Sequence, residues 1–486
     1  MLLLMGLRIY YGFSFSEPLQ YISSGDEQAS LYAIWKYVNG LEVFTDPTRS
    51  PYSMSYFNAL FYAAYGTWTW TWQGLLSVPD AWIPTIARTL TLVGVLLGWV
   101  GLSVAFRFIV RANGSPRDAA IEPMAVLSAA IVFVGPLMGF WAITVRPDVW
   151  ALTCEAVGVL VFLKTYGRNK TQAAILAAII FFIAWMFKQS AIGAVSGVGL
   201  FLLTGRCFRP LVFYCAVFWG LCAVCILGGD DVYRQSLFFS KIQLVFSPAH
   251  ALGVWGNALP KTLPIYLPLL LVIYGLIRHA EFRARLFADW VALLFLTGFV
   301  ASAGVMSVLT LQDGSAENYT FTPTVFAAGL LIRSSVCAGG MSALSKISHA
   351  WIAAAGIHVV LCILVIAGAA GLLDAAGKNH AYWTNMKTCI DKFPKPVFVQ
   401  DTYLSLPWMV ESTEPFVLAH TYSQTREVGV PHEMGGIGGR IAAGEFRTLA
   451  LSTDQADVGY DGARLDGYKL QTGQCGNLFI WSRVEP

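Results

Sequence analysis

Long apolar segments separated by short polar connections occupy most of the chain up to residue 373. Eleven such segments are visible, at 1–13, 82–106, 122–140, 149–163, 172–187, 190–205, 210–228, 262–277, 289–311, 319–332 and 349–373. Several only just approach the roughly 20 residues that a helix needs to cross a bilayer. The pattern predicts an α-helical multi-pass membrane protein with about 11 transmembrane helices.

The first apolar segment, Met1 to Phe13, is short for a membrane span. As a helix it would rise only about 20 Å, whereas the hydrocarbon core is about 30 Å thick. It lacks a basic leading stretch and a small-residue cleavage site, so we do not expect a signal peptide. We expect a shortened first spanning helix, or a start site assigned too late.

Basic residues alternate between the connections. One set of alternate connections carries 13 Lys and Arg residues, namely Arg107, Arg111, Arg117, Lys164, Arg168, Lys170, Arg206, Arg209, Arg278, Arg283, Arg285, Arg333 and Lys346. The short connections between them carry only Arg146 and Lys188. Because basic residues collect on the cytoplasmic side, the first set is predicted to be cytoplasmic. The loop 14–80, the short connections and the tail are then expected on the periplasmic, extracytoplasmic face of the inner (plasma) membrane.

Composition supports the membrane prediction and excludes one class of partner. The chain of 486 residues is 56% hydrophobic and 13% charged, whereas soluble domains carry about 25% charged residues. The net charge of +3 is too small to indicate binding of nucleic acid.

The tail, residues 374–486, differs from the preceding module, residues 1–373. It holds 13 of the 29 acidic residues and no long apolar run. Short β-rich runs at 397–400 and 477–481, and a possible helix at 436–446 leading into a strand at 448–451, predict a small α/β domain. We expect this domain to lie outside the membrane.

The glycine-rich run at 435–439 resembles a phosphate-binding loop. Such loops follow a strand and open a helix at a fixed spacing, which is missing here. A flexible turn is therefore the favoured interpretation.

Two of the nine cysteines, Cys389 and Cys475, lie in the tail, one near each end. In an oxidising outer compartment they could form a disulfide or remain free thiols. No Cys or His spacing indicates a zinc site, so no metal ligand is predicted.

Ionisable and polar side chains at the outer connections are the candidate functional residues, because such groups at membrane depth are costly. They are Asp26, Glu27, Arg146, Asp148, Lys188, Asp313, Glu317, Asn318 and Tyr319. They come from separate connections on one predicted face, so a helical bundle could bring them into one cavity.

Each candidate also has a structural interpretation. Asp26 and Glu27 could simply form a solvated loop. Arg146 and Asp148 could be an ion pair at a helix end, where a carboxylate suits the N-terminus. Lys188 would need a buried acid partner, or else an anionic ligand such as a phosphate, which we favour.

The order of the short motifs resembles a known family. The acidic pair Asp26-Glu27 precedes an aromatic stretch around Tyr52, and the Arg146-Pro147-Asp148 motif opens an apolar segment. Lys188-Gln189 then separates two segments, and Glu317-Asn318-Tyr319 opens a later one. With an α/β domain after the last segment, the chain resembles the C superfamily (GT-C) of membrane glycosyltransferases. This superfamily includes the protein O-mannosyltransferases and the lipid A aminoarabinose transferase.

The resemblance implies transfer of a single sugar, a hexosyl or pentosyl group, from a polyprenyl-phosphate donor to an acceptor on the outer face. Asp26 would be the catalytic carboxylate, a general base for inverting in-line displacement. Lys188, helped by Arg146, would stabilise the departing phosphate. Asp148 would hold hydroxyl groups or orient the base, and Glu27 would pair with a cation or bind substrate.

Other residues that match the motifs would contact the substrate; they are Tyr52, Gln189, Glu317, Asn318 and Tyr319. The acceptor would be a lipid, a glycan or a protein. No cofactor is required by the sequence, although some relatives use a divalent metal. Two other functions stay open, a secondary transporter of a polar or lipid-linked substrate and a non-catalytic scaffold. A transporter of this size commonly contains internal repeats, and we find none.

Overall fold

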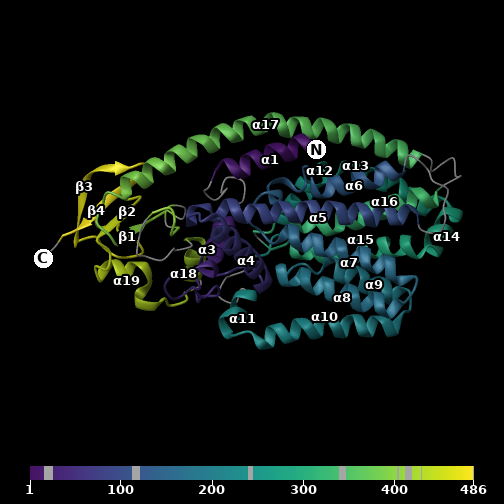
Figure 1. The fold of residues 1–486 in the computed structure, drawn as a ribbon, viewed down its shortest axis with the longest axis horizontal. Coiled ribbons are helices and arrows are strands. Elements are labelled where there is room, and N and C mark those ends of the chain that lie inside the picture. Colours follow the sequence, from purple (N-terminus) through teal and green to yellow (C-terminus); the bar gives the residue numbers. More distant parts are fainter. Residues whose placement is uncertain are drawn as a thin grey trace.

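Helices dominate the computed structural model, and a small sheet lies beyond one end of the helical bundle (Figure 1). The structure describes residues 1–15, 26–111, 121–238, 245–312, 314–338, 346–401, 404, 406–410, 419–427 and 429–484. The helices of the first 390 residues are α1 (Leu2–Ser14), α3 (Asp26–Val38), α4 (Ala59–Leu76), η1 (Asp80–Trp82), α5 (Ile83–Arg111), α6 (Ile121–Phe133), η3 (Gly139–Ala142), α7 (Asp148–Tyr166), α8 (Lys170–Phe187), α9 (Gly193–Thr204), α10 (Phe208–Gly228), α11 (Asp231–Leu237), α12 (Pro248–Lys261), α13 (Leu263–Arg278), α14 (Ala280–Ala288), α15 (Trp290–Leu309), η4 (Glu317–Thr320), α16 (Phe321–Cys337) and α17 (Lys346–Ile390).

Each of the 11 predicted apolar segments coincides with a helix or a bent helix pair. Among the described residues, 7 helices are long and apolar enough to cross a membrane, and the bent pair α12–α13 would make 8. Three further apolar helices, α1, α6 and α9, are shorter. The structure thus has a multi-pass architecture, and the count of 11 spans stays a prediction.

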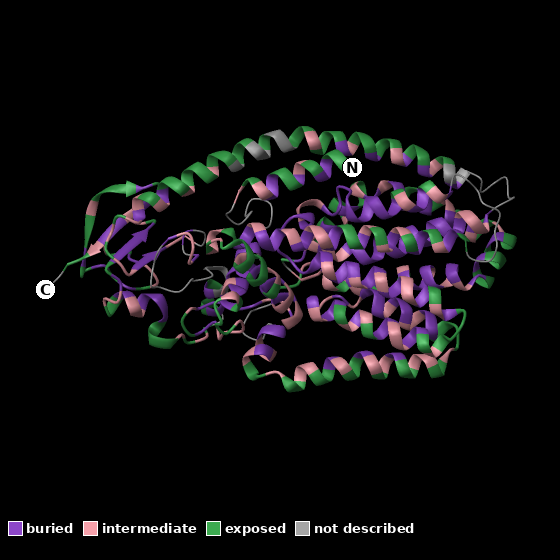
Figure 2. Cartoon of the chain, viewed as in Figure 1, coloured by how far each residue is buried: buried purple, intermediate pink, exposed green. Residues whose placement is uncertain are grey.

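The outer surface of the bundle is apolar along its peripheral helices. Figure 2 shows exposed residues along α10 and α17. On α10 they include Val224 and Leu227, and on α17 they include Ile363 and Leu364. Exposed apolar faces of this length would be unfavourable in water, so we interpret them as surfaces in contact with lipid.

The interior of the bundle depends on close packing of small residues. Helix α7 packs between α5 and α8, and α15 packs against α9 and α16. At the α9–α15 crossing, a Cβ atom on Gly197 would lie 2.8 Å from the Cα atom of Gly298. Only glycine permits this approach, which is a common way for membrane helices to associate.

The sheet has the strand order β1-β2-β4-β3. Strand β1 (Val397–Val399) pairs in parallel with β2 (Thr448–Leu451), and β4 (Leu478–Arg483) pairs antiparallel with β2 and with β3 (Tyr468–Cys475). Helices α18 (Ala419–Glu427), η5 (Glu433–Gly435) and α19 (Gly436–Ala442) accompany it. The small α/β unit predicted for the tail is present.

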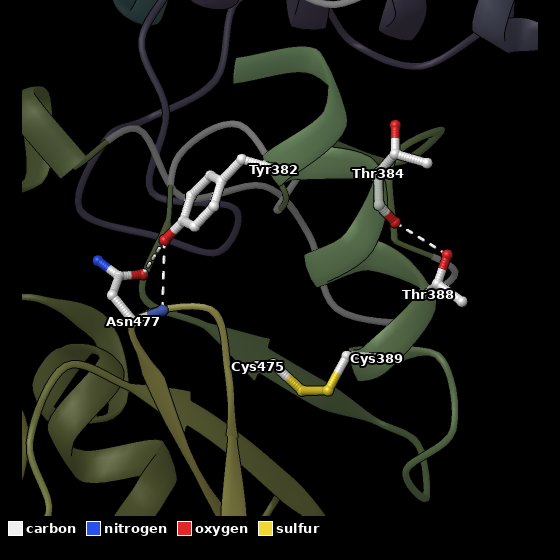
Figure 3. The surroundings of a disulfide bond; sticks show 6 residues. All are labelled: Tyr382, Thr384, Thr388, Cys389, Cys475 and Asn477. Atoms are coloured by element: carbon white, nitrogen blue, oxygen red, sulfur yellow. Dashed lines mark hydrogen bonds between the residues drawn. A yellow bond between two sulfur atoms is a disulfide. The ribbon is translucent and has the colours of Figure 1, made fainter. Parts of the chain in front are cut away.

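Helix α17 connects the bundle to the sheet without interruption, so the predicted boundary between residues 373 and 374 falls inside one helix. Its far end is fastened to β3 by a disulfide between Cys389 and Cys475 (Figure 3), with a Cα–Cα distance of 5.6 Å. The Tyr382 hydroxyl donates to the Asn477 side chain close by, at 2.7 Å. Of the two alternatives left open for these cysteines, the structure has the disulfide.

The glycine-rich run at 435–439 is not a flexible turn, because most of it forms the start of α19. Three of its backbone N–H groups already have acceptors, among them Gly435 N, which donates to His432 O at 3.1 Å. Gly438 N donates to Asp461 Oδ2 at 2.8 Å, and Ile437 N donates to the Tyr422 hydroxyl at 2.7 Å. A phosphate would have to displace these acceptors.

Candidate functional site

Asp148 lies at the N-terminus of α7 and is the centre of a buried polar group. Lys188, the residue that ends α8, forms an ion pair with it, with 2.6 Å between Nζ and Asp148 Oδ1. Asn318, from η4, donates its amide to the same oxygen. Residues from three separate connections therefore meet at one carboxylate.

The ion pair of Lys188 with Asp148 is relevant to both interpretations of Lys188, the structural one and the one with an anionic ligand. A structural role required a buried acid, and Asp148 supplies one; the side chains are 13% and 4% exposed. The Lys188 ammonium also lies 4.8 Å from the centre of the Tyr319 ring, a cation–π contact. Tyr319 is thereby part of the same group.

Arg146 brings a second positive charge to this region. The residue is buried, and its guanidinium lies 5.9 Å from the Phe140 ring and 5.8 Å from the Trp141 ring. Burial lowers the pKa of the guanidinium, and the nearby Asp148 charge opposes that shift. Two cations thus surround one carboxylate.

A small pocket borders this group. Its polar lining consists of Asp148, Glu155, Lys188, Ser190, Asn318, Tyr319 and Thr322, and its volume is about 30 Å³. This is room for about two water molecules rather than a sugar. Asn318 Oδ1 is buried beside it and has no hydrogen-bond partner within the described residues. An unsatisfied buried oxygen is costly, which marks a position where a ligand could donate a hydrogen bond.

Glu155 is a candidate that sequence reasoning missed. It lies two turns along α7 from Asp148, lines the same pocket and is buried. One carboxylate oxygen accepts from Ala194 N at 3.2 Å, and the other accepts from the Thr322 hydroxyl. The signal was available, because an acid within an apolar segment, seven residues after Asp148, must share its helical face.

The two residues of the acidic pair have different surroundings. The side chain of Asp26 lies outside the described residues, although its backbone begins α3. Glu27 has no exposed surface and forms a bidentate ion pair with Arg88. Arg88 Nε lies 3.1 Å from Glu27 Oε1, and Arg88 Nη2 lies 3.0 Å from Glu27 Oε2. Its Oε1 also accepts from Val145 N at 3.0 Å. Glu27 was expected either to pair with a cation or to bind substrate, and in the structure it pairs with the cation of Arg88.

This pairing connects the start of α3 to the Asp148 group, because Val145 directly precedes Arg146. Tyr65, from α4, is buried within range of the charges of both Asp148 and Glu27. Its hydroxyl shares a hydrogen bond of 2.8 Å with Thr91. The helix that begins at Asp26 is therefore anchored next to the polar group.

Three of the predicted substrate-binding residues lie elsewhere or are engaged. Tyr52 is buried against the C-terminal unit, where its hydroxyl donates to Glu433 O at 3.1 Å and its ring is 5.5 Å from Tyr422. In this structure it packs within the C-terminal unit, and its contact with substrate stays a prediction. Gln189 donates to Tyr56 O at 2.8 Å, and Glu317 forms an ion pair with Lys261. Asp313 lies outside the described residues.

No three His, Cys, Asp or Glu side chains in the described part of the chain are arranged to hold a metal ion. The Asp26 side chain and the loop before it lie outside the described residues, so a divalent metal at that position stays a prediction.

Comparison with solved structures gives a loose structural likeness. No protein-family model matches the chain, and no curated protein has a detectably similar sequence. The crystal structure of the Archaeoglobus fulgidus oligosaccharyltransferase, a complex with Zn and sulfate, aligns with a TM-score of 0.40 and 12% identity. The alignment covers 84% of this chain and 61% of that chain, so this chain spans less than two thirds of that protein. A likeness at this score is too loose to indicate a function.

Proposed function

We propose that the chain is an integral-membrane glycosyltransferase that moves a single sugar from a polyprenyl-phosphate donor to an acceptor on the outer face of the membrane. The observation that carries the proposal is the group around Asp148. It combines two cations, a carboxylate and an unsatisfied amide oxygen beside a pocket. These are groups that bind phosphate and sugar hydroxyls.

The charges favour an anionic ligand at the Asp148 group. Arg146 and Lys188 both interact with Asp148, so the immediate group carries one positive charge in excess. Glu155, the other carboxylate at the pocket, lies about 10 Å further along α7 at 1.5 Å per residue. A phosphate between the two cations would compensate the excess charge in a region where water is scarce.

Each residue then has a role in an in-line displacement. The acceptor oxygen attacks the anomeric carbon while its proton passes to the Asp26 carboxylate, and the bond between that carbon and the phosphate oxygen breaks. Lys188 and Arg146 stabilise the charge that develops on the leaving phosphate. Asp148 aligns Lys188 and, with Asn318, holds sugar hydroxyls. Glu27 positions Val145 and α3, so we assign it a positioning role.

The proposal predicts that Asp26→Asn removes sugar transfer and leaves the fold intact. Loss of a general base costs about 100-fold or more in rate. The measurement is transfer from a radiolabelled polyprenyl-phosphate sugar by the purified chain in nanodiscs, with the thermal unfolding midpoint (Tm) as the test of folding. Glu42→Gln, an exposed acid of the same loop, is the matched control and should keep wild-type activity. Full turnover by Asp26→Asn would overturn the assignment of the base.

A further inference from the structure

A second pocket, larger than the one at Asp148, lies on the other side of η4. It measures about 380 Å³ and is lined by Gly139, Phe140, Trp141, His250, Gly253, Val254, Asn257, Lys261, Ser315, Ala316 and Glu317. Pockets of roughly 300–1,000 Å³ are typical of small-molecule sites. The volume suits one sugar unit.

One wall of this pocket is α12, whose orientation is unusual in the bundle. Helix α12 meets α13 at a bend of 97°. If α13 crosses the membrane, α12 lies along its surface, and its exposed Leu252 and Leu259 face the lipid. The residues of α12 that line the pocket include His250, Asn257 and Lys261. With α12 in that position, the pocket would lie at the depth of lipid head groups.

The lining combines an aromatic wall with polar groups whose charges cancel. Lys261 pairs with Glu317. His250 Nε2 donates to Ser315 O at 2.9 Å. Trp141 is 3% exposed, and its indole N–H finds no acceptor within the described part of the chain. A neutral, hydroxyl-bearing ring matches this lining better than a phosphate does, because its hydroxyls can both accept and donate.

The pocket shares its walls with the Asp148 group. In η4, Glu317 lines the larger pocket whereas Asn318 and Tyr319 line the smaller one. Trp141 packs edge-on against Phe321, with ring centres 5.6 Å apart, and Phe321 also lines the smaller pocket. A ligand in the larger pocket is thus one side-chain layer from the proposed reaction centre.

We propose that this pocket binds the sugar head of a lipid-anchored acceptor, so that the acceptor class is a glycolipid rather than a protein. The identification of the bound lipid as the acceptor rests on the proposed function. The binding of a lipid with a sugar head group can be measured without any sugar transfer. The lipid tail would lie beside the exposed face of α12, and the head would reach across the membrane surface to Trp141 and Asn257.

The glycines of α12 allow a well-matched test. A Cβ atom at Gly253, which lines the pocket, would meet no other atom within 4 Å, so Gly253→Phe should fill the pocket without disturbing the packing. Gly256 is equally open and does not line the pocket, which makes Gly256→Phe the control. The probe is an alkyl glucoside that carries a diazirine, incubated with the full chain in phosphatidylcholine nanodiscs and cross-linked by light. Labelled peptides are mapped by mass spectrometry.

We expect labelling of peptides from η3, α12 or η4, competed by unlabelled octyl glucoside and not by octyl phosphate. Gly253→Phe should lower this labelling about tenfold, the effect of losing one or two hydrogen bonds, while Gly256→Phe should not. Labelling that is absent, unchanged in Gly253→Phe or competed equally by octyl phosphate would overturn the proposal. The proposed function fails separately: labelling without any sugar transfer removes the transferase and keeps the sugar-head site.

Discussion

The Glu27–Arg88 pair and the Asp148–Lys188 pair have the same chemistry and differ in their surroundings. Both join a buried carboxylate to a cation from another helix. Glu27 and Arg88 have no exposed surface, and Arg88 also donates to Gly12 O and Phe15 O, at 2.8 Å and 2.7 Å. Their hydrogen-bonding capacity is used within the protein.

The Asp148 pair, in contrast, borders a pocket. Lys188 keeps 13% of its side chain exposed, and the amide oxygen of Asn318 has no partner among the described residues. A structural ion pair is stable when every neighbouring polar group is satisfied, whereas a binding site retains capacity for a ligand. The first pair is therefore a structural ion pair, and the unused hydrogen-bonding capacity beside the second pair supports the ligand-binding role that we propose for it.

The largest effect is expected from breaking the first pair. Arg88→Met leaves the Glu27 carboxylate buried without its cation, which costs about 3–5 kcal/mol of the free energy of unfolding. The folded yield and the Tm in detergent should fall sharply. The double variant Glu27→Gln with Arg88→Met removes both charges and should recover most of that stability. A small effect of Arg88→Met alone would contradict a structural role for this pair.

We expect Lys188→Ala to lower stability less than Arg88→Met does and to weaken binding of the donor substrate. Asp148 keeps the amide of Asn318 and the charge of Arg146, so the Tm should fall less than in Arg88→Met. The donor phosphate loses one charge-assisted hydrogen bond, so KM for the polyprenyl-phosphate sugar should rise about tenfold. Steady-state transfer at varied donor concentration measures this. An unchanged donor KM would count against a phosphate role for Lys188.

Much of the fold could be predicted from the sequence, because hydropathy is a local property of each segment. The 11 apolar segments, the small C-terminal sheet and the Cys389–Cys475 disulfide all have counterparts in the structure. The meeting of Asp148, Lys188 and Asn318 could be predicted only as a possibility, since it depends on how distant helices pack. Their individual contacts join residues 40 and 170 positions apart.

Two contacts of the candidate residues were not predicted from the sequence, for physical reasons. Tyr52 lies in an aromatic stretch that is typical of a membrane interface, but its contact is with Glu433, 381 positions later, which no local pattern indicates. Arg88 was not among the predicted candidates, because the segment 82–106 around it contains no other charged residue. An arginine within such a segment needs an acidic or carbonyl partner, so its presence was a signal for an ion pair such as the one with Glu27.

Lys36 is a third buried cation, and it differs from Arg88 and Lys188 in its partners. Within the described residues its hydrogen bonds go only to neutral groups. Its Nζ donates to Val43 O at 2.7 Å and to Thr45 Oγ1 at 3.0 Å, and it lies 5.2 Å from the Tyr32 ring centre. Burial lowers the pKa of this ammonium to about 7, with an opposing contribution from Glu42. A buried cation that forms no ion pair within the described residues should make stability sensitive to pH.

The prediction for Lys36→Met is therefore a change in the pH dependence of stability. Between pH 7 and the ordinary lysine pKa of about 10.4, the unfolded chain binds a proton that the folded chain lacks. Stability conferred by this site should rise with pH through that window and be lowest below pH 7. Lys36→Met removes the titration, so its Tm relative to wild type should be most favourable at pH 6 and should decline towards pH 9. Each kcal/mol corresponds to about 2–4 °C in Tm. A difference in Tm that stays constant from pH 6 to pH 9 would show that Lys36 keeps an ordinary pKa, and the contrast with Arg88 would then have to rest on hydrogen bonding alone.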